Sequence, residues 1–315
     1  MTVKVAVLVD ECQAEGEHSI GQACAEALRS KGNDAVVVQA DSRLSSALAQ
    51  LRPDVCYLAI TGPKAHDGSV RALLDFLGIA YAGSSAQSCQ EASDAFLTGY
   101  EIDRYCGSND EARVAFTPPG FCLTRETYDA LGAKEMLELA EQRVPGGFPL
   151  CVKPAHAGIP VRVKMVLDAV ELADAVEDVL AHDTAVMVEE WVSGAMAELC
   201  VIGAGWDAHV LPPVEVVPGP DGGQRFVPIR LESLSSSESD AQAIRAEMER
   251  AALQAYDALD ARDFGLVRVI WDGGACKVVG VDLAPEIAPG TSFGLACEAA
   301  GISVAGLIDR LVHIV

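Results

Sequence analysis

The stretch Lys277–Ser292, KVVGVDLAPEIAPGTS, runs from an apolar strand into two prolines and a glycine. Because successive side chains of a strand point to opposite faces, Asp282, Ala284 and Glu286 share one face at the end of this strand. Magnesium binds hard oxygen ligands, usually carboxylates together with phosphate and water. Asp282 and Glu286 are therefore candidate metal ligands, and the stretch is either the metal-binding edge of an active site or the remnant of one.

Length and composition limit the kind of protein to which this edge can belong. The chain has 315 residues and a mass of 33.0 kDa, which is long enough for two or three domains. Hydrophobic residues make up 50% of it and aromatic residues 5%, a composition typical of an α/β enzyme. The formal net charge of -23 disfavours phosphate backbones and anionic lipid, so we expect neither nucleic acid nor a membrane surface as a partner.

The sequence also indicates a compartment. The opening stretch MTVKVAVLVDE lacks the order of charged, apolar and small residues that marks a signal peptide. No run reaches the roughly 18 apolar residues of a membrane span. The cysteines are scattered without C-x-x-C spacing, mostly in apolar segments. We therefore expect a cytoplasmic protein whose cysteines are reduced and buried.

The order of strand and helix patterns predicts three parts. Residues 1–92 alternate apolar strands with amphipathic helices, which predicts an N-terminal domain with a doubly wound parallel sheet. Residues 93–184 predict a central subdomain that opens with an aperiodic polar connection over residues 100–120. Residues 185–315 predict a C-terminal subdomain of strands and helices. The expected fold class is α/β, with an α+β arrangement in the C-terminal half.

Two further stretches carry candidate ligand-binding residues. In PLCVKPAHAGIP, Lys153 ends an apolar strand before a turn at Gly158, where an ammonium group and loop N–H groups can hold phosphate. In VMVEEWVSG, the strand with Glu189, Glu190 and Trp191 can offer backbone groups to a purine and a carboxylate to ribose hydroxyls. Taken alone, such charges are more often solvated strand ends.

Together these stretches resemble the ATP-grasp fold and, over essentially the whole chain, the D-alanine–D-alanine ligase family. FPLCVKPAHAG is similar to the family's VVKP strand and GSS loop, and VMVEEWVSG is similar to its VEE adenine-binding strand. RVI and APEIAPGTS are similar to its RVD and EVNTLPGMT segments. DGSVRALLDFLGIAYAGSS resembles its EDG, long helix and LGIPYTGS segment. The resemblance implies an ATP-grasp fold and the ATP-dependent joining of two D-alanines.

The resemblance assigns family roles to several retained residues. It implies that Glu15 binds the amino group of the first D-alanine and that Arg268 stabilises a tetrahedral oxyanion. It also implies nucleotide contacts and a turn near the second D-alanine. The nucleotide residues are Lys153, Gly158, Glu189, Glu190 and Trp191, and the turn residues are Gly290 and Ser292.

Other family positions are replaced, and these include positions that bind phosphate and metal in the family. The lysine that reaches the nucleotide phosphates corresponds to Ala95, and the loop that covers the phosphates begins Gly158-Ile159-Pro160, without its two serines. The metal-binding aspartate corresponds to Ile270, and the glutamate and asparagine of the metal edge correspond to Ala284 and Glu286. Loss of one electrostatic donor commonly costs on the order of a hundredfold in rate.

Two classes of function follow from this pattern. In the first, the chain is a non-catalytic or weakly active relative with an eroded site, which binds a nucleotide, a D-amino acid or a partner chain. In the second, it is an active ATP-dependent carboxylate–amine ligase that makes the D-alanine dipeptide of peptidoglycan synthesis, or another small amide, with metal between Asp282 and Glu286. The replacements favour the first class, with ATP as a candidate ligand and Mg²⁺ doubtful. The family resemblance implies a homodimer, and a dimer that binds no small molecule is a third alternative.

Overall fold

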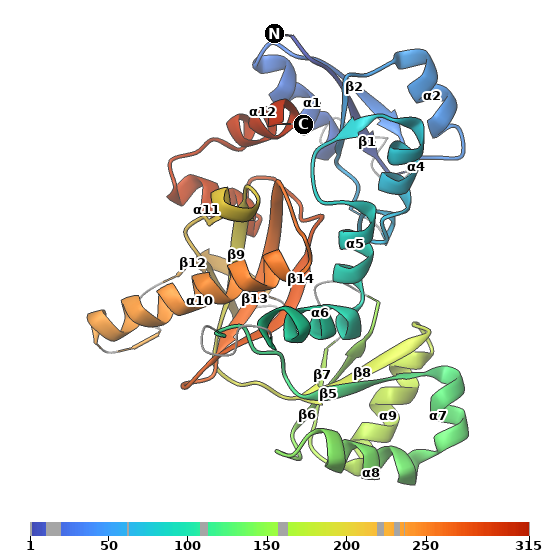
Figure 1. Cartoon of the computed structure of the whole chain (residues 1–315), viewed down its shortest axis with the longest axis vertical. Helices are drawn as coiled ribbons and strands as arrows, with labels where there is room; N and C mark the ends of the chain where they lie inside the picture. Colours follow the sequence, from blue (N-terminus) through green and yellow to red (C-terminus); the bar gives the residue numbers. More distant parts are fainter. Residues whose placement is uncertain are drawn as a thin grey trace.

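The computed structural model of the 315-residue chain describes residues 2–10, 20–61, 63–107, 113–156, 163–218, 224–229, 234–235 and 237–314. Its elements form one parallel and two antiparallel sheets with covering helices. The N-terminal sheet lies at one end of the molecule, the central sheet at the other, and the C-terminal sheet between them (Figure 1). In the part of the chain that the structure describes, no helix is both long enough and apolar enough to cross a membrane.

The N-terminal unit confirms the predicted parallel sheet, whose strand order is β2-β1-β3-β4. Strand β1 is a continuous apolar run because both its faces are buried, with Val5 and Val7 in one core cluster and Ala6 and Leu8 in another. The elements of this unit are β1 (Lys4–Val9), α1 (Ile20–Ser30), β2 (Asp34–Gln39), α2 (Leu44–Leu51), β3 (Val55–Leu58), α3 (Pro63–His66), α4 (Ser69–Leu77) and β4 (Ala80–Tyr81).

The central unit is an antiparallel sheet with the strand order β5-β8-β6-β7 and helices packed on one face. Strand β8 begins directly after the expected boundary at residue 184, and it pairs with β5 and β6 of the central sheet. The elements of this unit are β5 (Gly120–Thr124), α7 (Arg125–Leu131), α8 (Ala133–Arg143), β6 (Leu150–Pro154), β7 (Lys164–Val166), α9 (Ala169–Leu180) and β8 (Ala185–Glu190).

Two helix boundaries lie where local chemistry predicts them. Helix α4 stops at Gly78, whose φ of 66° is a left-handed conformation that glycine adopts without a steric penalty. Helix α9 begins after Asp168, whose carboxylate accepts hydrogen bonds from the N–H groups of Val170 and Glu171. The glycine and the aspartate therefore each determine one end of a helix through contacts with neighbouring residues only.

The prediction of an aperiodic connection over residues 100–120 is wrong in its first part. Helix α5 (Ala86–Ser93) is followed by α6 (Ala95–Gly107), which continues through residue 107. Helix α6 buries about one residue per turn, so most of its surface is solvent-facing and its apolar periodicity is weak. The buried side chains of α6 are Thr98, Ile102 and Cys106.

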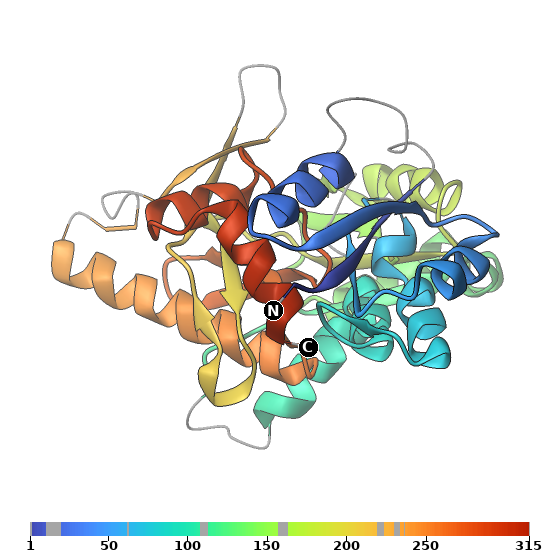
Figure 2. The same ribbon diagram turned by 90° about the horizontal axis from the view of Figure 1, so that it is seen from above.

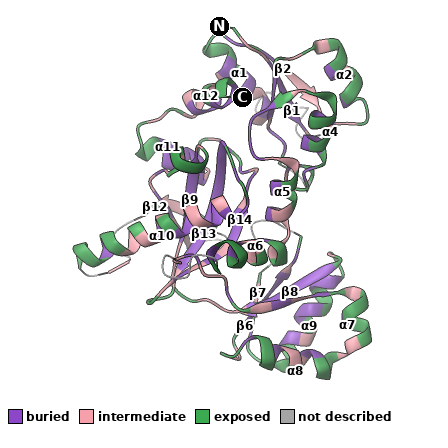
Figure 3. Ribbon diagram, viewed as in Figure 1, coloured by how far each residue is buried: buried purple, intermediate pink, exposed green. Residues whose placement is uncertain are grey.

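The C-terminal unit is an antiparallel sheet with the order β12-β11-β9-β13-β14, and β10 pairs with β9. Its inner strands are almost fully buried, and α10 packs on one face (Figure 3). The elements of this unit are β9 (Ala195–Ile202), η3 (Gly205–Asp207), β10 (His209–Val210), β11 (Val214–Pro218), β12 (Gln224–Pro228), α10 (Glu238–Ala258), β13 (Phe264–Trp271), β14 (Cys276–Asp282), α11 (Ser292–Ala299) and α12 (Val304–Ile314).

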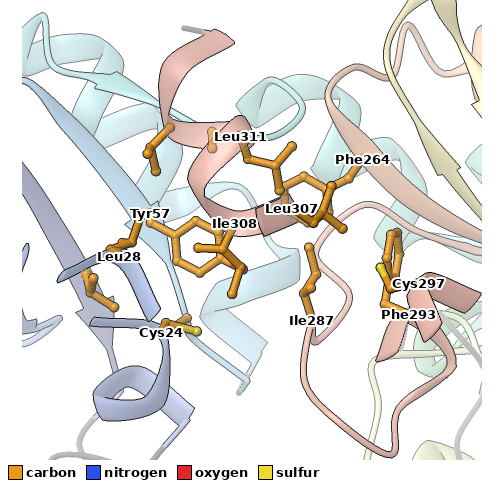
Figure 4. Packing of buried hydrophobic residues seen from close by; sticks show 14 of the residues in the cluster. Cys24, Leu28, Tyr57, Phe264, Ile287, Phe293, Cys297, Leu307, Ile308 and Leu311 are labelled. Atoms are coloured by element: carbon orange, nitrogen blue, oxygen red, sulfur yellow. The ribbon is translucent and has the colours of Figure 1, made fainter. Parts of the chain in front are cut away.

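One hydrophobic core joins the two ends of the chain. Helix α12 lies beside α1 in both views, and the side chains of Leu307 and Ile308 pack in one cluster with Cys24 and Leu28 of α1 (Figures 2 and 4). The same cluster includes Phe293 of α11 and residues of β9 and β13. The N-terminal sheet is therefore packed against the C-terminal sheet through the C-terminal helices.

Candidate nucleotide site

A pocket of about 250 Å³ lies between the facing surfaces of the central and C-terminal sheets, and we name it the inter-sheet pocket. It brings together five of the residues that the sequence singled out, from three different strands and the turn after β8. It also contains Ile270, at the position expected to hold a metal-binding aspartate. The lining residues are Cys151, Lys153, Val163, Glu189, Glu190, Trp191, Val192, Met196, Gln224, Arg268, Ile270 and Val279.

Strand register places a buried ion pair in this pocket. Cys151 is paired with Glu189 and Lys153 with Met187 on neighbouring antiparallel strands, so all four side chains share the face opposite the helices. The Nζ atom of Lys153 donates to Oε1 of Glu189 at 2.5 Å and to the carbonyl of Val279 at 3.4 Å. Both charged side chains are buried, so the predicted phosphate-binding lysine is already matched by a carboxylate.

A second buried carboxylate engages the predicted oxyanion-binding arginine. Arg268 of β13 lies opposite Glu198 of β9, and its Nε atom donates to Oε1 of Glu198 at 3.0 Å. The Ser292 hydroxyl donates to the other oxygen of Glu198, and all three residues are buried. Glu198 was not among the residues predicted from the sequence, although a single carboxylate within the apolar run AELCVIG indicates that a buried cation lies nearby.

The chain segment after β8 supplies the rest of the predicted nucleotide residues. The N–H of Glu190 donates to the carbonyl of Pro119 at 3.0 Å, and that of Trp191 donates to Pro149 at 3.3 Å. Both side chains are half-buried at the pocket, and in the described part of the chain the Glu190 carboxylate has no hydrogen bond or ion pair. Burial raises the pKa of Cys151 to about 12, so its thiol is protonated at neutral pH.

Both carboxylates of the predicted metal edge lie beside the N-terminal unit. The Oδ1 atom of Asp282 lies 3.1 Å from Nδ1 of His66 in α3 and accepts the Ala284 N–H at 2.8 Å. Glu286 is exposed, and partial desolvation raises the pKa of its carboxyl. Burial raises the pKa of Cys24 in α1 to about 12, with the nearby charge of Glu286 as a second cause. The Glu286 carboxylate thus faces the N-terminal unit.

The assignment of Asp282 and Glu286 as metal ligands therefore stays a prediction, because the described residues around them do not form a set of metal ligands. Within the described ranges, no three His, Cys, Asp or Glu side chains lie close enough together to hold a metal ion. Ile270 and Ala284 offer no donor atom, and the nearer carboxylate oxygen of Asp282 already has two partners.

The turn after the metal edge has a clear local structure. Gly290 is exposed and has a φ of 85°, and the Thr291 hydroxyl accepts the Gly294 N–H at 3.3 Å as the cap of α11. Ser292 points inward to Glu198, so its hydroxyl is engaged. The predicted substrate turn thus begins a helix and supports the buried cluster around Arg268.

A larger cavity of about 410 Å³ adjoins the inter-sheet pocket and shares Lys153, Glu189 and Val279 with it. Its other walls come from α6, residues 117–120 and β14. Ala95, at the position of the expected lysine, lines this cavity, and its N–H donates to the carbonyl of Ala155 at 2.8 Å. The predicted residues Glu15 and Gly158 lie outside the described residues, as do Ile159 and Pro160.

Two antiparallel sheets that face one another across a pocket with a strand lysine, behind a parallel N-terminal domain, define the ATP-grasp class of fold. A family model described as D-ala D-ala ligase C-terminus matches residues 117–313. The chain belongs to the D-alanine–D-alanine ligase family, as its sequence predicts.

Named relatives agree with this assignment. A D-alanine–D-alanine ligase of Anaeromyxobacter sp. (strain Fw109-5) is 32% identical over 217 residues, covering 68% of this chain and 64% of that relative. One of Halalkalibacterium halodurans is 26% identical over 333 residues and covers 99% of both chains.

The solved structures share the fold over nearly the full length. The D-alanine–D-alanine ligase of Bacillus anthracis, complexed with ATP, has a TM-score of 0.77 and 22% identity, covering 99% of this chain and 97% of that one. The VanG D-Ala:D-Ser ligase of Enterococcus faecalis has a TM-score of 0.76 and 17% identity, covering 100% and 99%.

Proposed function

We propose that this chain is a member of the D-alanine–D-alanine ligase family with an eroded active site, which binds an adenine-containing ligand and is non-catalytic or only weakly active in D-alanine ligation. The observation that carries this proposal is the state of the two retained cations. Lys153 forms an ion pair with the buried carboxylate of Glu189, and Arg268 forms one with the buried carboxylate of Glu198.

These two ion pairs disfavour ligation for an electrostatic reason. An attacking carboxylate and a triphosphate are both anionic, so cations must neutralise their approach in the transition state. A cation that already holds a buried carboxylate gives little of its charge to a ligand, because breaking the pair leaves a charge desolvated. Ala95 removes a further cation from the family set.

The described residues do not fit the family's usual magnesium site. Ile270 is 5% exposed and offers no donor atom, and Ala284 packs against the N-terminal core. Asp282 is engaged by His66, and Glu286 faces the N-terminal unit. The apolar side chains at 270 and 284 and the engagement of Asp282 support the loss of metal-dependent phosphoryl transfer, and we derive no step through the metal.

The described residues do fit a purine. An adenine edge presents an amine donor beside a ring-nitrogen acceptor. Lys153 and Glu189 offer a donor and an acceptor on one face of the central sheet, and Trp191 and Ile270 add apolar surface. Glu190 is placed to accept from a ribose hydroxyl. When bound, ATP would supply the phosphoryl group, which an eroded site leaves unused.

An active ligase is the second candidate. Lys153 and Arg268 lie in one pocket, and a relative named D-alanine–D-alanine ligase covers 99% of this chain. A small shift of β9 relative to β13 on substrate binding would release Arg268 from Glu198 toward a developing oxyanion.

Calorimetric titration with adenine ligands, paired with a phosphate-release assay in the presence of ATP, Mg²⁺ and D-alanine, separates these candidates. Binding without phosphate release supports the eroded-site proposal. Phosphate release that depends on D-alanine would replace it with the active-ligase reading. If no adenine ligand binds and no phosphate is released, the adenine-binding part of the proposal is wrong.

A further inference from the structure

We propose that the cavity of about 410 Å³ beside α6 binds a small aromatic monocarboxylate, as a second ligand site separate from the inter-sheet pocket. We name this cavity, whose main walls are α6, residues 117–120 and the edge strand β14, the α6 cavity. The proposal goes beyond the adenine-binding function and does not depend on it, because those walls do not belong to the inter-sheet pocket.

A buried ion pair stands between the two cavities. Lys153 and Glu189 line both of them, and so does Val279, whose carbonyl accepts from Lys153. Lys153 and Glu189 are 3% and 5% exposed, and Nζ lies 2.5 Å from Oε1. Separating this pair to join the cavities would leave two buried charges unpaired, which is strongly unfavourable. A ligand in the α6 cavity therefore contacts one side of the pair and leaves the inter-sheet pocket free.

The charged side chains that line the α6 cavity leave one cation available to a ligand. Arg113 forms an ion pair with Asp103, and Lys153 forms one with Glu189. Arg143, at the end of α8, is exposed and has no ion pair with any residue that the structure describes. The described walls thus carry an excess of one positive charge in a chain of net charge -23. This balance favours a ligand with a single negative charge.

Two aromatic side chains give the cavity an apolar wall. Phe96 and Tyr100 lie four residues apart on α6 and therefore share one face of the helix. The two residues are 47% and 54% exposed, so much of their ring surface is open to a ligand. Pro118 and Met187 add further apolar surface. An aromatic ring can pack against these rings in offset or edge-to-face contact, which a simple inorganic anion cannot do.

Small residues keep the cavity open. Ala95 and Gly99 are one turn apart on α6, and both line the cavity. A Cβ atom on Gly99 would have no neighbour closer than 4.0 Å, so the space beside the helix is free at this point. The volume of about 410 Å³ lies within the range of roughly 300–1,000 Å³ that is usual for small-molecule sites.

The first test measures the affinity of the wild-type chain for 3-phenylpropionate, its uncharged analogue 3-phenylpropionamide and acetate by calorimetry at neutral pH. We expect a dissociation constant below about 1 mM for 3-phenylpropionate, roughly three- to tenfold weaker binding of the amide and no measurable binding of acetate. Raising NaCl from about 50 to about 300 mM should weaken the carboxylate and leave the amide unchanged, because salt screens the exposed charge of Arg143.

The second test removes the available cation with Arg143→Gln. The carboxylate and the amide should then bind with equal affinity, because the charge that distinguishes them is gone. Arg310→Gln is the matched control, since it removes the same charge from an exposed position on α12 outside the cavity. The control should keep the preference of the wild type for the carboxylate.

The third test fills the cavity with Gly99→Leu, which should abolish binding of 3-phenylpropionate. Gly107→Leu is the matched control on the same helix, because a Cβ atom there meets nothing within 4 Å and Gly107 does not line the cavity. Both changes replace a helical glycine by a better helix former, so we expect both variants to fold. Melting temperatures check that they do.

Each outcome decides a part of the proposal. Loss of binding in Gly99→Leu, with binding retained in Gly107→Leu, supports the site. No binding to the wild type, or unchanged binding in Gly99→Leu, overturns it. Displacement of 3-phenylpropionate by saturating adenosine or ATP would overturn a site separate from the inter-sheet pocket. Equal affinity for the carboxylate and the amide in the wild type would overturn the role of Arg143. Absence of adenine binding alone would overturn the adenine-binding function and leave this inference in place.

Discussion

The Nδ1 atom of His66 lies 3.1 Å from Oδ1 of Asp282, so the strand end that the sequence suggested as a metal edge is tied to α3 of the N-terminal unit. Burial alone would lower the pKa of His66, but the hydrogen bond and charge of Asp282 outweigh it and raise the pKa above its usual value of 6.5. Arg71 and Asp67 act on the same imidazole in opposite directions. The contact links the two units most strongly when His66 is protonated.

The first prediction concerns stability and pH. Because the folded chain holds the His66 proton more tightly than the unfolded chain, the contribution of His66 is complete below about pH 6.5 and is lost as pH rises through the raised folded value. The difference in unfolding free energy between the wild type and His66→Gln should therefore shrink from about pH 6 to about pH 8.5. Urea denaturation across this range measures it, and a constant difference would contradict the assignment.

The second prediction concerns the partner of Arg268. Glu198→Ala should lower the unfolding free energy by about 3–5 kcal/mol, because it leaves the arginine charge buried without a carboxylate. Ser292→Ala removes one neutral donor from the same carboxylate and should cost only about 0.5–1.5 kcal/mol. Chemical denaturation of both variants checks the order, and equal costs would mean that Arg268 finds another partner.

The third prediction concerns the ion pair between the two cavities. Lys153→Met and Glu189→Leu should each destabilise the chain by roughly 3 kcal/mol or more, because each leaves one buried charge unpaired. The double variant should lose less than either single variant, since an apolar pair replaces an ion pair in a buried site. Adenosine binding should be lost in all three. A double variant whose loss equals the sum of the single losses would show that the two side chains are not coupled.

The fourth prediction concerns the missing metal ligands. Ile270→Asp should lower stability by about 1–3 kcal/mol, because it puts a carboxylate at a buried position with no metal. Added Mg²⁺ should not restore that stability in the single variant. When Ala284→Glu is combined with it, the melting temperature in ATP should become dependent on Mg²⁺. Ile270→Asn is the uncharged control, and a response to Mg²⁺ in the wild type would count against an eroded metal edge.

The fifth prediction concerns the turn between β8 and β9. A Cβ atom on Gly194 would lie 2.0 Å from the carbonyl oxygen of Trp271, so Gly194→Ala must shift β13 or the turn beside the pocket. We expect a loss of about 1–3 kcal/mol, together with weaker adenosine binding. Gly274→Ala is the control, since its nearest neighbour would be the Asp272 side chain at 3.7 Å. Similar stability of the two variants would contradict the close packing.

Local signals predicted much of the fold. The apolar run of β1, the end of α4 at Gly78 and the start of α9 after Asp168 each depend only on neighbouring residues. Lys153 and Arg268, which the family segments single out, both line the inter-sheet pocket. These features are encoded within short stretches, so a single sequence suffices to find them.

The features that the sequence did not reveal depend on long-range contacts or weak periodicity. Glu198 lies 70 residues from Arg268 and 94 from Ser292 along the chain, and only strand register brings the three together. His66 meets Asp282 by the same kind of tertiary packing. Helix α6 buries too narrow a stripe to give a clear pattern. None of these relationships leaves a local signature.

The contact between α1 and α12 has a consequence for synthesis. Cys24 and Leu28 emerge early from the ribosome, whereas Leu307 and Ile308, which cover them, are made much later. At the usual pace of roughly 5–20 residues per second, the nascent N-terminal sheet waits many seconds with one flank uncovered. During that interval its apolar surface is available to chaperones and to other nascent chains, so the yield of folded protein in cells should depend on translation speed and chaperone supply.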